Sequence, residues 1–181
     1  MATSEHTHKV GPDQGKLILN TTRQGLAAQV GHDLTIEVTR WSGEIVLAED
    51  PAQSTVRITA ETGSLRVLDG GGGIKPLSEG DKREILGNAR KILGSDRRPE
   101  ARFTSDKITT DARGGGTIDG TLSLAGTDRP LRLEVTALGD GRYRGTGRII
   151  QSDYGIKPYS AFFGALKIAD PVGVTAEVDL S

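Results

Sequence analysis

Two neighbouring segments of this chain, residues 34–47 and 56–67, alternate apolar and polar side chains along most of their length. A period of two is typical of a β-strand with one buried and one solvated face. In each segment the alternation changes phase beside a glycine, at Gly43 and at Gly63. Such a phase change indicates a bulge or a sharp bend. Two long, adjacent, bent strands favour a sheet that curls towards closure.

The same two segments are expected to pair as a hairpin. Asp50 and the proline after it fit the first two positions of a type I turn. The register that follows from this turn puts apolar residues opposite one another on one face, in the pairs Leu47–Val56 and Ile45–Ile58.

Alternation and turn residues along the whole chain predict about eight strands, at residues 16–22, 34–47, 56–67, 103–112, 117–124, 131–137, 143–152 and 174–180. One helix is predicted at about residues 78–93, because Ser78 is a good N-cap, apolar residues recur at helical spacing and Gly94 is a suitable stop. Antiparallel strands joined in sequence favour an up-and-down barrel, since closure removes both edges. The apolar stripe of the helix is expected to pack against this barrel.

The length of 181 residues suits one domain. Residues 1–13 are polar and lack periodicity, so we predict a disordered tail there and one barrel domain over residues 14–181. The first residues contain no apolar h-region, which predicts a cytoplasmic protein. A formal net charge of -1 without a run of like charges indicates neither nucleic-acid binding nor a polybasic anchor, and no apolar run is long enough for a transmembrane segment.

Two motifs invite a functional interpretation and do not support it. His6 and His8 could bind a metal, but two ligands in a tail make an incomplete site, so no metal is predicted. The glycine run at residues 70–73 lacks the Gly-Lys-Ser/Thr ending of a phosphate-binding loop and is interpreted as a flexible connection.

Four of the seven aromatic residues lie within ten positions: Tyr154, Tyr159, Phe162 and Phe163. The segment contains glycine and proline, which argues against a central strand. Aromatic residues on a loop between strands either plug one end of a barrel, line the entrance to a ligand site, or form a small core beneath the loop.

Several motifs, in this order, resemble one known family. They are Gly31-His32-Asp33-Leu34, Trp41-Ser42-Gly43-Glu44-Ile45, residues 54–64, Arg102-Phe103-Thr104-Ser105, residues 119–131 with Gly126-Thr127-Asp128-Arg129-Pro130-Leu131, and Ser152-Asp153-Tyr154-Gly155-Ile156. The chain is similar over residues 14–181 to the YceI-like family of polyisoprenoid-binding proteins. The resemblance implies an all-β, eight-stranded antiparallel, lipocalin-like barrel with a long apolar tunnel for isoprenoid or fatty-acid-like chains. Many members of the family are periplasmic, and residues 69–100 depart from its usual pattern.

The leading hypothesis is non-catalytic binding or carriage of a small amphiphilic lipid: a polyisoprenoid, an isoprenoid quinone or a fatty-acid-like chain. We expect the lumen to be lined by Leu34, Ile36, Val38, Ile58, Leu122, Leu124, Leu133 and Val135. The entrance candidates are Tyr154, Tyr159, Phe162 and Phe163, whose tyrosine hydroxyls could meet a head group. The family's histidine corresponds best to His32, a structural or head-group candidate. No cofactor other than a bound isoprenoid lipid is expected, and a homodimer is left open.

Two alternatives remain. One is a hydrolase or isomerase using His32 with Asp33, although adjacent strand residues point to opposite faces and no Gly-x-Ser-x-Gly motif is present. A structural histidine bonded to the backbone suits this spacing better. The other is a stress-related structural or interaction protein whose barrel is filled by its own side chains.

Overall fold

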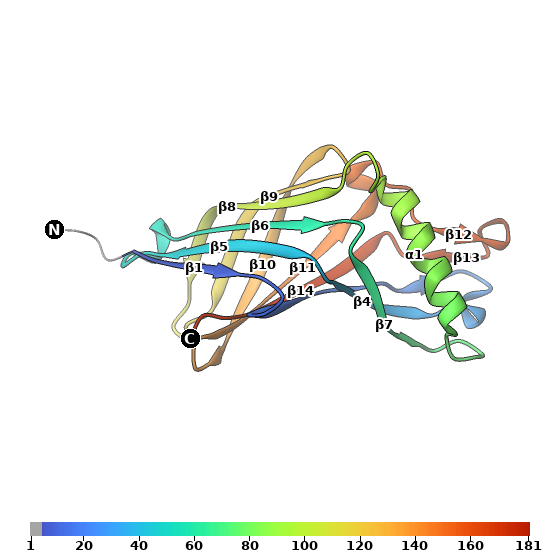
Figure 1. Ribbon diagram of the computed structural model, residues 1–181, viewed down its shortest axis with the longest axis horizontal. Coiled ribbons are helices and arrows are strands. Elements are labelled where there is room, and N and C mark those ends of the chain that lie inside the picture. The colour runs from blue at the N-terminus through green and yellow to red at the C-terminus, as the bar shows by residue number, and fades with distance from the viewer. Residues whose placement is uncertain (1–4) are drawn as a thin grey trace.

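A computed structural model describes residues 5–181. It is mostly β with one α-helix, and an antiparallel sheet of 11 strands curls into a half-barrel (Figure 1). In sheet order its strands are β1 (His6–Val10), β5 (Trp41–Leu47), β6 (Thr55–Glu61), β8 (Glu100–Thr110), β9 (Gly116–Leu124), β10 (Thr127–Gly139), β11 (Arg142–Ile150), β14 (Pro171–Asp179), β2 (Gly15–Asn20), β4 (Asp33–Val38) and β7 (Leu65–Gly71).

A small second sheet and several short turns complete the chain. The sheet has three strands, in the order β12 (Ser160–Ala161), β13 (Leu166–Ile168) and β3 (Arg23–Gln24). The 3-10 turns are η1 (Ala28–Val30), η2 (Pro51–Gln53), η3 (Gln151–Tyr154) and η4 (Phe162–Gly164). This sheet and its loops lie at the end of the molecule opposite the N- and C-termini (Figure 1).

The two long bent strands predicted at residues 34–47 and 56–67 are present, and each is divided into two strands at its bend. The first is β4 followed by β5, and the second is β6 followed by β7. The bend is held by backbone bonds from Thr39 N to Ser64 O (2.7 Å) and from Glu61 N to Arg40 O (3.0 Å). The hydroxyl of buried Ser64 also accepts a bond from Arg40 N at 3.0 Å. Because β5 and β6 belong to one end of the sheet and β4 and β7 to the other, this hairpin links the two ends.

These interruptions explain why the predicted count of eight strands is not the count observed. Each of the two long strands is divided in two, and one strand, β1, was not expected. The prediction of a disordered tail is therefore wrong for residues 6–10, which pair with β5. Val10 is buried with Trp41, and Lys9 forms an ion pair with Glu44. Residues 1–4 of the predicted tail lie outside the described residues.

The predicted register of the β5–β6 hairpin is wrong by two residues. Ile45 faces Val56, and Gly43 faces Ile58. A Cβ at position 43 would lie 2.4 Å from Ile58 Cδ1, so glycine is what allows this pairing. Asp50 caps the turn η2 by accepting a bond from Ala52 N at 3.0 Å, which lengthens the connection. A shift of two residues leaves every side chain on its predicted face.

The predicted helix is confirmed as α1 (Glu79–Leu93). Ser78 Oγ accepts a bond from Asp81 N (3.1 Å) while Asp81 Oδ2 accepts one from Ser78 N (2.8 Å), which is a capping box. Gly94 ends the helix with a φ of 63°. Its apolar side chains pack against two clusters of the sheet, Ile85 and Leu86 on one and Ile92 and Leu93 on the other. The helix thus spans these two clusters, near the end of the molecule that carries the small sheet (Figure 1).

Candidate ligand-binding cavity

The curled sheet encloses a cavity of about 800 Å³. Every strand of the large sheet except β1 contributes to its lining, and α1 contributes from the flank. Alternation brings this about, because one face of each strand points inward and carries Leu, Ile, Val, Phe or Trp. Within residues 5–181 no large side chain is completely buried, since the inward-facing residues surround a hollow.

Seven of the eight residues predicted for the lumen line this cavity: Leu34, Ile36, Val38, Ile58, Leu122, Leu124 and Leu133. Val135 is half-buried and does not belong to the lining. Val135 lies two residues closer than Leu133 to the turn that joins β10 to β11, and it pairs with Gly116 and Gly145.

Sequence reasoning missed several lining residues. The largest are Trp41 and Phe103, and a further group comes from β2 and β14: Leu17, Leu19, Val172, Val174, Ala176 and Val178. The sequence did contain a signal for the residues of β2 and β14, because alternation in these strands separates their apolar face from their polar face. What alternation does not show is which of several inward faces border empty space.

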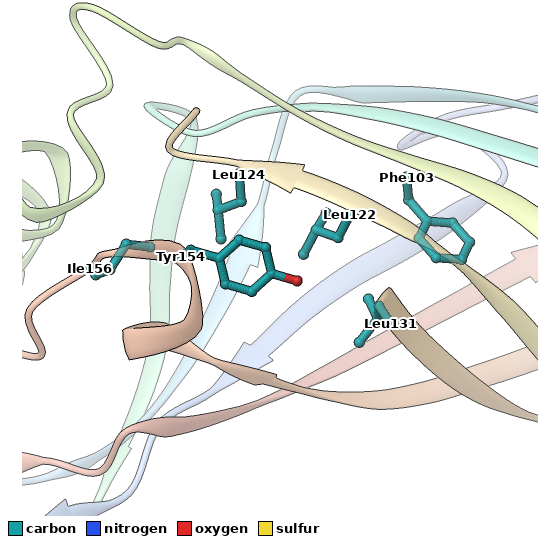
Figure 2. Close-up of a cluster of buried hydrophobic side chains, with 6 residues drawn as sticks. All are labelled: Phe103, Leu122, Leu124, Leu131, Tyr154 and Ile156. Atoms are coloured by element: carbon teal, nitrogen blue, oxygen red, sulfur yellow. The ribbon is translucent and has the colours of Figure 1, made fainter. Parts of the chain in front are cut away.

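The four aromatic candidates for the entrance separate into different environments. Tyr159 and Phe162 line the cavity, whereas Phe163 is fully exposed and outside it. Tyr154 is only 4% exposed and packs in the cluster drawn in Figure 2, with its hydroxyl directed towards the side of Leu122 and Leu131. Burial, with a smaller contribution from the charge of Asp153, raises the pKa of the Tyr154 hydroxyl. Tyr154 is therefore a core residue that packs against β8, β9 and β10.

His32 lies at the edge of the cavity and is bonded to the backbone. Its Nε2 is 2.6 Å from the carbonyl oxygen of Lys75, which joins the start of β4 to the loop before α1. Asp33 turns to the other side and accepts a bond from Arg23 N at 2.8 Å. The two side chains do not form the base and orienting carboxylate that a hydrolase would need.

Polar side chains of the lining gather near the helix. His32 and Lys75 approach from the loops, and Asp81, Glu84 and Asn88 come from α1. Hydrogen bonds with Ser78, and then the nearby charge of His32, lower the pKa of Asp81. The cavity therefore combines a long apolar surface with a group of polar residues beside the helix, and Thr21, Glu61, Thr62 and Gln151 are polar residues elsewhere in its lining. Within residues 5–181, no three His, Cys, Asp or Glu side chains are grouped as metal ligands.

Comparison with known proteins assigns the fold to a family. A family model described as the YceI-like domain matches residues 17–180. The chain belongs to the YceI-like family. No curated protein sequence matches it.

Solved structures share this YceI-like fold at low sequence identity. BcnA of Burkholderia cenocepacia superposes with a TM-score of 0.66 and 14% identity, covering 91% of this chain and 94% of that one. A Campylobacter jejuni YCEI protein superposes with a TM-score of 0.54 and 17% identity, covering 79% and 81% of the two chains. None of the helices within residues 5–181 has the length and apolar character of a membrane span.

Proposed function

We propose that this YceI-like protein binds or carries an amphiphilic lipid in its cavity, without catalysing a reaction. The ligand is a polyisoprenoid, an isoprenoid quinone or a fatty-acid-like chain. The observation that carries the proposal is the hollow itself: about 800 Å³ bordered by inward faces of ten strands that are almost wholly apolar. A barrel filled by its own side chains, as the interaction-protein alternative requires, would have no such space.

The size and surface of the cavity suit a lipid chain. Sites for small ligands commonly enclose roughly 300–1,000 Å³. Burial contributes about 0.8 kcal/mol for each CH₂ group. A few isoprene units would therefore offset much of the roughly 4–15 kcal/mol that association costs in lost freedom.

The polar flank supports an amphiphile over a pure hydrocarbon. His32, Lys75 and the side chains of α1 that border the cavity can hydrogen-bond a head group, and Tyr159 adds a hydroxyl from the loop. A head group placed there would leave its apolar chain among the residues of β2, β4, β9 and β14. Buried polar groups retain their hydrogen bonds in such an arrangement.

The same geometry supports binding over catalysis. The ring of His32 already bonds a backbone carbonyl, and Asp33 bonds Arg23. A general base must lie within hydrogen-bond reach of the proton that it removes, with a partner to orient it.

Native mass spectrometry of the purified protein tests the proposal. We expect a mass above that of the apoprotein, and extraction into organic solvent should release an isoprenoid or acyl lipid. An apoprotein mass in every preparation, together with no uptake of an added isoprenoid quinone or fatty acid, would refute lipid binding.

A further inference from the structure

Exposed apolar side chains concentrate at the end of the molecule that carries the small sheet. Among residues 5–181, seven large apolar residues are exposed, and five of them belong to this group: Leu26, Val30, Ile74, Phe162 and Phe163. We call these five residues the apolar rim. Leu26 is 95% exposed, Ile74 is 70% exposed and Phe163 is fully exposed. Single exposed apolar residues are ordinary, but a group of this kind marks an interaction site.

The rim comes from three loops that are attached to one another. They are residues 25–31, 72–78 and 155–167. Ala27 N donates to Ala165 O at 2.8 Å, which joins the first loop to the third. The bond between His32 Nε2 and Lys75 O joins the second loop to the residue that follows the first. Figure 1 shows these segments at one end of the molecule, away from both termini.

The backbone holds the two phenylalanines outward at a cost. Phe162 has a φ of 51° and Phe163 a φ of 55°, the left-handed region that non-glycine residues rarely adopt. A bond from Ala165 N to Phe162 O (3.1 Å) closes the turn. Strain of this kind persists where the surrounding structure enforces it and is common at functional sites. As a result, Phe162 lies at the exposed edge of the cavity and Phe163 projects fully into solvent.

The charges of the three loops have one sign. Their 27 residues contain Lys75, Lys157 and Lys167 but no aspartate or glutamate. All three lysines are exposed, and within residues 5–181 none forms an ion pair. Carboxylates flank these segments, among them Asp33, which bonds Arg23, Asp81, which bonds Ser78, and Glu79, which pairs with Lys82. Apolar tips beside unpaired lysines are complementary to the surface of an anionic bilayer.

The rim is also continuous with the cavity. Val30, Ile74 and Phe162 line the cavity, while Leu26 and Phe163 extend beyond it. We propose that the protein docks on the surface of an anionic lipid bilayer through this apolar rim, with Leu26 and Phe163 entering the interface and Lys157 and Lys167 beside the head groups. Docking would place the open side of the cavity against the bilayer. The docking itself does not depend on what the cavity holds.

Flotation of the full chain with lipid vesicles tests the proposal. The probes are vesicles of phosphatidylcholine alone and vesicles of phosphatidylcholine mixed with phosphatidylglycerol. We expect binding to the mixed vesicles that weakens in high salt, because screening reduces the attraction of the lysines. The variant Leu26→Ser with Phe163→Asn changes no residue of the cavity lining and should lower the partition coefficient by about tenfold or more.

Two further variants make the result specific. Lys157→Gln with Lys167→Gln should reduce the preference for phosphatidylglycerol. Leu47→Ser, which replaces an exposed apolar residue on β5 opposite His6, should bind as the wild type does. A thermal melt confirms that each variant is folded. The proposal is overturned if the wild type does not float with either vesicle, or if the rim variant floats equally well. It is also overturned if the rim variant abolishes a dimer seen by size-exclusion chromatography while the wild type does not bind vesicles.

Discussion

Gly145 of β11 lies opposite Ala176 of β14, and both residues border the cavity. Glycine has no side chain and alanine has only a methyl group, so this pair leaves space in the lumen beside Leu133 of the neighbouring strand β10. A Cβ added at Gly145 would have no neighbour closer than 3.9 Å, and the residue has no positive φ. The glycine is therefore not required by the backbone, and it contributes to the room for a ligand.

Replacing this glycine should reduce lipid binding without unfolding the protein. We expect Gly145→Leu to occupy part of the cavity and to lower the amount of lipid retained, with a melting temperature equal to or above that of the wild type, because the leucine fills space. Native mass spectrometry measures retention. Thr146→Leu, on the exposed face one residue away, is the matched control. Equal retention in both variants would contradict a ligand in this part of the lumen.

The first strand should contribute to stability. Val10 is 5% exposed and packs with Val38, Trp41 and Ile45, so Val10→Ala should lower the free energy of unfolding by about 1–2 kcal/mol. Lys9→Ala removes only the exposed ion pair with Glu44 and should cost much less than Val10→Ala, because water and salt screen an exposed pair. Urea denaturation distinguishes the two. Equal, negligible losses would show that β1 is not part of the stable core.

Tyr154 should stabilise the protein through its ring. Phenylalanine keeps the ring that packs in this buried cluster, so Tyr154→Phe should change the free energy of unfolding by no more than about 0.5 kcal/mol. Tyr154→Ala should cost about 3–5 kcal/mol, because it leaves a void beside Phe103, Leu122 and Leu131. Denaturant unfolding of both variants measures the difference. A large loss in Tyr154→Phe would mean that the hydroxyl has a partner of its own.

Phe163 should be a residue whose removal stabilises the fold. Asparagine tolerates the left-handed region better than phenylalanine, and the exposed ring has little packing to lose. We therefore expect Phe163→Asn to raise the free energy of unfolding by about 0.5–1 kcal/mol. Phe103→Asn, at a buried position, should be strongly destabilising by comparison. A lower melting temperature for Phe163→Asn would show that the ring packs against the protein.

The helix cap should become weaker in acid. Hydrogen bonds with Ser78 lower the pKa of Asp81 below its ordinary value of 3.8, so the ionised carboxylate stabilises the folded state above that value. The contribution is lost as the pH falls below 3.8 and through the lower pKa of the folded state. Unfolding of the wild type and of Asp81→Asn, followed by circular dichroism at several pH values, should converge in acid and differ at neutral pH. A constant difference would contradict this role.

Local features were predictable because they depend on residues that are close in sequence. Ser78 and Gly94 bound the helix, and the alternation in residues 34–38 and 131–137 assigns inward and outward faces. Four of the seven predicted residues that line the cavity lie in these two segments: Leu34, Ile36, Val38 and Leu133. The register of the β5–β6 hairpin could not be predicted from the sequence. The turn after Asp50 is longer than the Asp50-Pro51 pair suggests, and Gly43 has no side chain, which leaves room for Ile58 opposite it.

The sequence by itself determined which side of each strand is apolar, where the helix begins and ends, and, through its ordered motifs, membership of the YceI-like family. Only the tertiary structure decided that residues 6–10 add a strand, that Tyr154 packs inside while Phe163 projects outside, and that the inward faces surround a hollow. The physical reason is that alternation is a property of neighbouring residues, whereas an empty volume depends on how far apart strands distant in sequence are held.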